Sequence, residues 1–417
     1  MKKLSDLIAY NEKRLLIVFF TFSLLIKLIY VIIIYQKQGL SGWVDDKYYL
    51  MIGGQFATGN FSPHPMGEQY LRVAPLIPLV VAFFYKIFGD PIIPFFAYNI
   101  ILSSLLVPIL YYLGKELVDN FTGWLMALWG LCNIEFFKYT PHILKEPTIY
   151  LLIPLILLLV LQQIRKANFV NLILAAILFS ILIHTDERYI VYLPVFPVIL
   201  FFYKPPKSAK IMREIIIWFS VVFLLMIPWT IRNYQEYGQI VIISHRTTPF
   251  TSKLWGKDIY GMKFVKTKQN ILHNDRLQSN DTRVINPIEN NRLNLYFKTF
   301  VNIWQPTFFK TKKVRYSWWV DERNQKWSLR HNLISFFFYG LFLPFYVIGL
   351  IISIKRKNIL LLFIGLLPVI HNLLHTFMVM PEERYRYPFV FIIVMIGIWA
   401  LKESLNFLRN TFSVSKI

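Results

Sequence analysis

The sequence is short of charge and of cysteine. Only 16% of its 417 residues are charged, whereas an average soluble domain has about 25%, so polar residues are too few to cover a soluble surface. The single cysteine, Cys132, excludes an internal disulfide and the class of disulfide-stapled secreted folds. Hydrophobic residues make up 56% of the chain, and the mean hydropathy is +0.47. This composition excludes an ordinary soluble enzyme and predicts an all-α polytopic membrane protein.

Common catalytic and nucleotide-binding motifs are also missing. The sequence contains no HExxH, GxxxxGK, GxGxxG or nucleophile elbow, so zinc proteolysis, a P-loop, a Rossmann fold and an α/β-hydrolase have no support. His371 and His375 are four residues apart and share a helix face, but no third metal ligand accompanies them in the sequence. The chemistry must therefore be sought in less regular clusters.

The charge that is present is strongly basic. Lysine and arginine number 45 against 23 acidic residues, which gives a net charge of +22. Much of this excess lies in short loops between apolar runs, where it marks cytoplasmic loops and attracts anionic lipid. We therefore expect a lipid bilayer, and no nucleic acid, as the partner of the basic residues.

Ten apolar runs are long enough to be read as membrane spans. The first, Leu15–Tyr35, follows a basic leader and predicts a retained signal-anchor with a cytoplasmic N-terminus. The other runs cover 95–114, 121–139, 148–163, 169–184, 189–203, 214–230, 335–354, 358–376 and 388–402. With ten spans, five basic segments fall on the cytoplasmic side: Lys115, Arg165 with Lys166, 204–213, 355–357 and 402–409.

An eleventh apolar stretch, Val73–Phe88, does not fit this alternation. It is short and contains Pro75, Pro78 and Lys86. We interpret it as a juxtamembrane or re-entrant helix on the outer side, although an eleventh span stays open. The chain then divides into a transmembrane module at 1–230 with an outward loop at 36–94, an extracytoplasmic basic domain of mixed or unassigned fold at 231–334, and C-terminal transmembrane helices with a cytoplasmic tail at 335–417.

Acidic residues gather on the predicted outer side. Asp45 and Asp46 lie just beyond the first span, among aromatic residues. They are either part of a solvated interfacial loop or a general base beside a lipid-borne substrate. Glu146 begins a later span, where it suits a helix N-terminus, but it faces the same side and could join the aspartates in one outward cavity. Asp186 and Arg188 occupy another outward turn, for which a local ion pair is the simplest interpretation.

Arginines on the outer side oppose the positive-inside bias, so they are weak topology markers. They are Arg72, Arg232, Arg384 and Arg386. The planar guanidinium offers paired donors to a phosphate. The alternative for each is an interfacial arginine that extends to the membrane surface.

Several short stretches, in this order and on this side, resemble the GT-C superfamily of lipid-dependent glycosyltransferases. The resemblance is greatest to protein O-mannosyltransferases, the aminoarabinose transferase of lipid A and their relatives in glycosyltransferase family 39. The matching stretches are Asp45–Tyr49, Arg72–Leu76 with Phe88-Gly89, Lys145–Pro147, Pro228–Gly238 and Arg384–Pro388. The family often has glutamate where this chain has Asp46, and 240–334 matches nothing in it.

The resemblance implies a GT-C helical bundle that transfers a sugar, with inversion, from a polyprenyl-phosphate donor to a hydroxyl of a lipid, polysaccharide or protein acceptor. It places the site on the outer face of a cell membrane, for which we expect the bacterial plasma membrane. Asp45 would be the general base, with Asp46 and Glu146 as further catalytic acids; Glu146 would position a substrate, or hold a divalent metal if one is used. No nucleotide cofactor is expected, because the carrier already bears a phosphate.

The resemblance also implies two groups of binding residues. Those expected to bind the donor phosphate are Arg72, Arg232, Arg384 and Arg386, and those expected to bind substrate are Tyr49, His142, Lys145 and Arg188.

Two other functions fit parts of the sequence. A transporter or flippase of lipid-linked sugars would also use outward arginines and many spans, but it would favour ionisable residues in mid-span. A membrane scaffold would explain the basic domain at 231–334 and leave the acids at Asp45 and Asp46 unexplained. The clustering of acids in loops at one interface favours the transferase.

Overall fold

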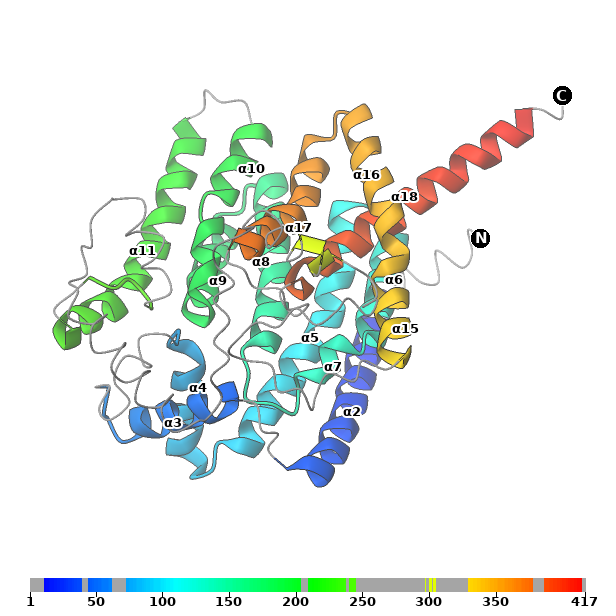
Figure 1. The fold of residues 1–417 in the computed structure, drawn as a ribbon. Helices are drawn as coiled ribbons and strands as arrows, with labels where there is room; N and C mark the ends of the chain where they lie inside the picture. The colour runs from blue at the N-terminus through cyan, green and yellow to red at the C-terminus, as the bar shows by residue number, and fades with distance from the viewer. Residues whose placement is uncertain are drawn as a thin grey trace.

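The computed structural model describes residues 11–39, 44–61, 73–203, 209–237, 240–244, 329–377 and 386–414, together with 297, 300, 301, 303 and 304. Within these ranges every regular element is a helix (Figure 1). The prediction of an all-α fold is therefore confirmed. Most of the predicted basic domain at 231–334 lies outside the described residues, as do Arg72 and Arg384.

The first half of the chain supplies most of the short helices. In chain order its elements are α2 (Glu12–Gln38), α3 (Val44–Ala57), α4 (Leu76–Phe88), α5 (Ile92–Leu117), α6 (Asn120–Cys132), α7 (Glu135–Lys138), α8 (Glu146–Lys166), α9 (Phe169–Thr185), the 3₁₀ helix η2 (Glu187–Tyr192), α10 (Val195–Tyr203) and α11 (Ala209–Tyr237). The elements that follow are α15 (Leu329–Phe338), the 3₁₀ turn η5 (Gly340–Phe342), α16 (Leu343–Lys355), α17 (Ile359–Phe377) and α18 (Tyr387–Val414).

Seven helical segments among the described residues are long and apolar enough to cross a bilayer, and they show a multi-pass membrane protein. Their bounds are Glu12–Lys37, Ile92–Leu117, Glu146–Lys166, Ala209–Gln235, Leu333–Lys355, Ile359–Thr376 and Tyr387–Thr411. They coincide with seven of the ten predicted spans. The other three runs form shorter helices: α6 has 13 residues, α9 has 17 and α10 has 9. Asn133 and Asp186 leave the helical conformation and end α6 and α9 there.

Helix α4 is the stretch that did not fit the predicted alternation. It has 13 residues, which rise about 20 Å at 1.5 Å per residue, short of the roughly 30 Å of a hydrocarbon core. It packs on α3 at one edge of the bundle (Figure 1). The packing is close at Gly53, where an added Cβ would lie 2.4 Å from Val81 Cγ1. Glycine at this position therefore lets the acid-bearing helix α3 approach α4.

Helices α8 and α18 form the centre of the bundle. Of the most apolar window of each span, 83% is buried in α8 and 72% in α18, against 17% in α2 and 22% in α11. Because α2 and α11 leave most of their apolar side chains uncovered, they form the lipid-facing periphery. The N-terminus of α8 is thus enclosed by other helices.

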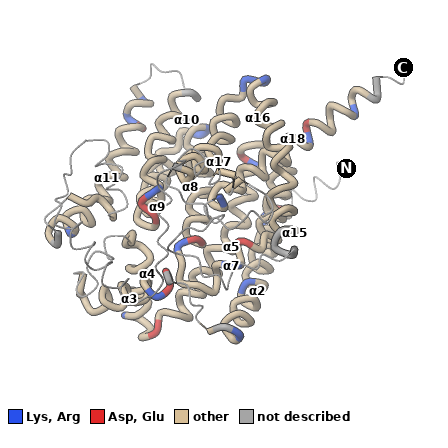
Figure 2. Tube along the Cα trace, viewed as in Figure 1, with Lys and Arg blue, Asp and Glu red and all other residues tan. Residues whose placement is uncertain are grey.

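Four ion pairs tie helices together at one end of the bundle. They are Glu12–Lys115, Glu116–Arg165, Asp119–Lys402 and Arg356–Glu403. These pairs join the start of α2 and the ends of α5, α8 and α16 to each other and to α18. Charged residues elsewhere in the described chain also lie mainly at helix ends and in connections (Figure 2). Basic residues predicted to share one side of the membrane, such as Lys115 and Arg165, do lie at the same end of the bundle.

Candidate active site

The two aspartates lie in the first turn of α3, where the helix dipole favours negative charge. Asp45 is partly exposed, whereas the Asp46 side chain is buried. Its Oδ2 lies 3.6 Å from Nδ1 of His142, a residue of the loop before α8. Tyr49, one turn further along α3, is buried in the main core. The helix therefore directs one carboxylate into the protein and leaves the other accessible.

The loop that carries His142 is itself buried and needs partners for its backbone. Asn99 of α5 supplies them: its Nδ2 donates to the carbonyls of His142 at 2.6 Å and Thr140 at 3.3 Å. The Thr140 hydroxyl donates in turn to the Phe137 carbonyl at 2.6 Å. These bonds fix the loop immediately before Lys145 and the start of α8.

Lys145 and Arg188 share one buried carboxylate, Asp186. Lys145 Nζ lies 2.7 Å from Asp186 Oδ2. Arg188 donates from Nε to Oδ1 at 2.7 Å and from Nη2 to Oδ2. Burial alone would raise the pKa of Asp186, but the charges of Arg188 and Lys145 outweigh it and hold this pKa well below its ordinary value. Two cations therefore face one ionised acid.

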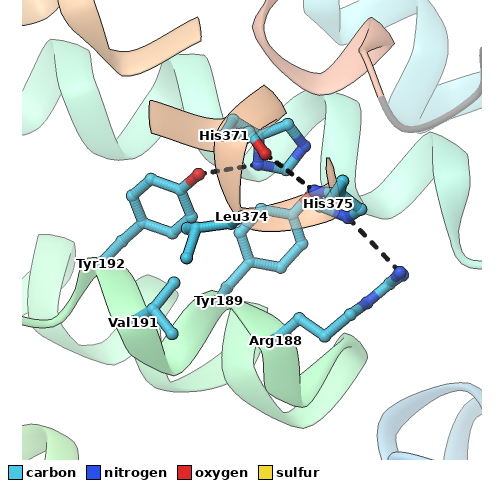
Figure 3. Close-up of a pocket in the computed structure, with 7 residues that line it drawn as sticks. All are labelled: Arg188, Tyr189, Val191, Tyr192, His371, Leu374 and His375. Atoms are coloured by element: carbon cyan, nitrogen blue, oxygen red, sulfur yellow. Dashed lines mark hydrogen bonds between the residues drawn. The ribbon is translucent and has the colours of Figure 1, made fainter. Parts of the chain in front are cut away.

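Arg188 also reaches α17. Its Nη1 lies 3.4 Å from Nε2 of His375, and Nδ1 of His371 lies 2.7 Å from the Tyr192 hydroxyl (Figure 3). These side chains, with Tyr189, Val191 and Leu374, line a hollow of about 250 Å³.

A second hollow, of about 490 Å³, adjoins the first and is almost wholly apolar. Its walls come from α8, α9, α10, α11, α17 and α18, and it shares Tyr189 and Tyr192 with the first hollow. The two tyrosines thus contribute to the walls of both hollows.

Glu146 occupies the first turn of α8, followed by Pro147, and is buried. The pKa of Tyr189 is raised chiefly by burial, then by neighbouring charges that include Asp186 and Glu146. Glu146 therefore lies close to η2. Among the described residues, no group of three or more His, Cys, Asp or Glu side chains could hold a metal ion, so we derive no step through a metal.

The structure gives Arg232 partners at the end of α11. Its guanidinium donates to Asn233 Oδ1 at 2.9 Å and to the Phe61 carbonyl, and it lies over the Trp229 ring. The neighbouring side chains bind the backbone of 241–243 through Trp229 Nε1 to Ile243 O, Thr230 Oγ1 to Ile242 O and Asn233 Nδ2 to Val241 O. The bond from Arg232 to Phe61 joins the end of α11 to the residues that follow α3.

Arg386 is likewise engaged in packing at the start of α18. It is buried, donates to Ser335 Oγ at 2.7 Å and to the Ile303 carbonyl, and lies over the rings of Tyr339 and Tyr387. A phosphate-binding role for Arg232 or Arg386 stays a prediction. Arg72 and Arg384 fall outside the described residues.

Of the predicted site residues, the structure connects Asp46 to His142, and Lys145 to Arg188, with Glu146 beside them. The local ion pair predicted for Asp186 and Arg188 is confirmed. Sequence reasoning missed the second pair of Asp186, with Lys145, and the contributions of His375 and Tyr192. The four-residue spacing of His371 and His375 was the one signal available for α17.

The comparisons with known proteins agree with this architecture. A family model described as dolichyl-phosphate-mannose-protein mannosyltransferase matches residues 72–231. The fold is similar to that of the Archaeoglobus fulgidus oligosaccharyltransferase in its apo form, with a TM-score of 0.56 and 13% identity over 94% of this chain. A structure of that enzyme tethered through a disulfide bond to an acceptor peptide containing the NVT sequon gives 0.57 and 12% over 97%.

The chain spans about half the length of these structures, 51% of each. No curated protein sequence matches it. Residues 72–231 of this chain are thus similar to that mannosyltransferase family, and its helical fold is similar to that of the oligosaccharyltransferase.

Proposed function

We propose that the protein is an integral membrane inverting glycosyltransferase that moves a sugar from a polyprenyl-phosphate donor to an acceptor hydroxyl on the extracytoplasmic face. One observation carries the proposal. Ionisable side chains from four parts of the fold contact one another in pairs. Asp46 of α3 contacts His142 of the loop before α8, and Lys145 of the same loop contacts Asp186. Asp186 pairs with Arg188 of η2, which contacts His375 of α17. Clusters of buried, interacting ionisable groups of this kind are typical of functional sites.

Lys145 and Arg188 are the proposed donor-phosphate residues. Both cations pair with one buried carboxylate, Asp186. Asp186 acts as a positioning residue because it holds both cations. An arginine fork and a lysine point charge together suit a phosphate. The adjoining apolar hollow, beyond Tyr189 and Tyr192, offers a place for the isoprenoid part of the donor.

Asp45 is the proposed general base. The acceptor oxygen would attack the anomeric carbon from the side opposite the phosphate, which inverts that carbon. The bond between the carbon and the phosphate oxygen breaks, its electron pair stays with the phosphate, and the acceptor proton passes to Asp45. Partial exposure lets Asp45 reach an acceptor, and general-base catalysis needs such hydrogen-bond reach. Lys145 and Arg188 would stabilise the charge that develops on the leaving phosphate.

Asp46 and Glu146 are proposed to position the reactants. Asp46 joins α3 to the loop of His142, which sets the distance between Asp45 and the cations. Glu146 follows Lys145 directly and lies beside η2, where it could orient a sugar hydroxyl. Tyr49 is buried below this turn and supports it.

The acceptor is the least defined partner. The matching family model is described as a protein mannosyltransferase, and the structural relative was crystallised with an acceptor peptide. We propose a protein, lipid or polysaccharide hydroxyl as acceptor and a hexosyl or pentosyl group as the sugar, in a bacterial plasma membrane. Membranes supplied with radiolabelled polyprenyl-phosphate sugars, and fractionated afterwards into protein, lipid and polysaccharide, would separate these acceptors.

The test of the whole proposal is sugar transfer by membranes that carry Asp45→Asn or Asp46→Asn. Loss of a general base lowers turnover by about 10²–10⁴-fold, so we expect that loss for Asp45→Asn. Asp90→Asn is the matched control, because Asp90 is exposed at the start of α5 and asparagine keeps its acceptor for the Ile92 amide.

Equal consumption of the donor by both variants and the unaltered protein would refute the general-base assignment. Movement of the donor across the bilayer without any transfer would indicate a flippase instead.

A further inference from the structure

The hydrogen bonds of His375 define which of its nitrogens carries a proton. Nδ1 lies 3.0 Å from the carbonyl oxygen of His371, one turn earlier on α17. A carbonyl can only accept, so Nδ1 must donate. Nε2 lies 3.4 Å from Arg188 Nη1, and a guanidinium can only donate, so Nε2 must accept. Both partners therefore require the same form, a neutral imidazole protonated on Nδ1.

This histidine contacts Arg188 from a second element of the fold. The Nε and Nη2 edge of the guanidinium is held by Asp186, which lies two residues before it in the chain. His375 meets Nη1 from α17, on the opposite side of the hollow (Figure 3). The guanidinium is thus bracketed by η2 and by a helix 187 residues away in the sequence. A fixed guanidinium loses less conformational freedom when it binds an anion.

A second contact fixes the helix that carries His375. Nδ1 of His371 lies 2.7 Å from the Tyr192 hydroxyl, which comes from the same 3₁₀ helix as Arg188. The His371 ring also stacks with Tyr189, at a centroid distance of 5.9 Å and an interplanar angle of 13°. Helix α17 and η2 are therefore joined by two side-chain contacts, one through each histidine, and these contacts fix their relative position.

We propose that His375 is a positioning residue that, as a neutral hydrogen-bond acceptor, sets the orientation of the Arg188 guanidinium for the donor phosphate. The assignment rests on the proposed function in so far as Arg188 binds the donor. The contact orients Arg188 in the same way for the bound donor and for the transition state, so its loss weakens the binding of both to a similar extent. We therefore expect the KM for the donor to rise, while kcat changes little.

Kinetics on the full-length protein in proteoliposomes test this proposal. His375→Leu removes the acceptor at similar volume, and we expect the KM for the polyprenyl-phosphate sugar to rise about tenfold, as for the loss of a hydrogen bond to a charged group. His375→Gln keeps an acceptor at the end of its side chain and should restore KM to within about threefold. Thr376→Val, a buried polar-to-apolar change on the same helix, is the control and should leave KM unchanged.

An unchanged KM in His375→Leu, or the same rise in all three variants, would overturn the positioning role. Nitrogen NMR of ¹⁵N-histidine-labelled protein decides the protonation form without any donor. The signal that His375→Gln removes should have the neutral pattern with the proton on Nδ1. A doubly protonated ring, or a proton on Nε2, would overturn the proposal even where the leucine variant does not fold.

These outcomes separate the two proposals. Full transfer activity in both Asp45→Asn and Arg188→Gln would refute the proposed function, yet the NMR result would still stand. Inactive Asp45→Asn and Arg188→Gln with a normal donor KM in His375→Leu would refute only the role of His375.

Discussion

The two charged ends of the bundle are built differently. At one end, four exposed or half-buried ion pairs match one acid with one cation each, as in Arg356–Glu403, where the side chains are 55% and 23% exposed. At the other end, Asp186 is fully buried and serves two cations, Lys145 and Arg188. Exposed pairs contribute little to stability because water and salt screen them. Burying charges is costly, and clusters of buried charges are concentrated at functional sites.

The comparison distinguishes ion pairs that hold helices together from ion pairs of the candidate active site. One-to-one pairs join α2, α5 and α8 to each other, and the start of α6 and the end of α16 to α18. Arg188 of the shared-acid cluster lines one hollow, and an apolar hollow adjoins it. Burial, and one acid shared between two cations, therefore distinguish the candidate site from the structural end.

Replacing the shared acid should have the largest effect on stability. Asp186→Asn removes the carboxylate charge that both Lys145 and Arg188 contact, and breaking a buried pair in this way costs about 3–5 kcal/mol. We expect a strongly lowered midpoint of unfolding in detergent and little folded protein in membranes. Asp119→Asn, which breaks the Lys402 pair at the opposite end, is the matched control. Equal losses in the two variants would contradict the distinction between the ends.

Acid should weaken the two ends unequally as well. The pKa of Asp186 is lowered on folding, so its contribution is fully present above the unfolded-state pKa of about 4 and is lost as the pH falls through the lower folded-state value. The pKa of Asp119 is also lowered on folding. Burial raises this pKa, but the hydrogen bonds from Lys402 and Thr122 outweigh that effect. Unfolding midpoints measured from pH 7 down to pH 3 should show the difference between Asp186→Asn and the unaltered protein constant above about pH 5. A difference that already shrinks near neutrality would assign the effect to another group.

Removing the support of the loop before α8 should have an intermediate effect. Asn99→Leu deprives the carbonyls of Thr140 and His142 of their donor, and each buried unsatisfied group costs about 1–3 kcal/mol. Since the loop sets Lys145 and His142, transfer activity should fall together with the unfolding midpoint. Ser104→Ala, at another buried polar position of α5, provides the comparison. A destabilised protein that keeps full donor affinity would show that the loop does not position Lys145.

The sequence predicted the elements better than their pairing. Hydropathy located the seven long helices, because a span must be apolar over about 20 residues whatever it packs against. Residue type and sidedness led to Asp46, Lys145 and Arg188. The pairing of Arg188 with His375 connects residues 187 positions apart, and no local pattern encodes such a contact.

The arginines also show that the sequence alone did not identify the partners of a side chain. Arg386 was selected for its charge and predicted sidedness, yet its guanidinium is engaged by Ser335 and two tyrosine rings. The PWTIRN segment was distinctive in the sequence, and in the structure its side chains bind the backbone of 241–243. A distinctive motif therefore indicates that its side chains make specific contacts. Which residues they contact depends on how the helices pack.

The smallest effect is expected at the ion-paired end and completes the comparison. Glu403→Gln removes the partner of Arg356, whose guanidinium also lies over the Trp399 ring, so the stability loss should be about 0–1 kcal/mol. High salt should abolish even this loss, because exposed pairs are screened over a Debye length of about 3 Å at 1 M. Donor KM and turnover should stay unchanged, since the pair lies at the end of α16, away from Lys145 and Arg188. A loss as large as that of Asp186→Asn, or one that salt leaves intact, would mean that this pair is buried in the membrane-embedded protein and that the two ends share one design.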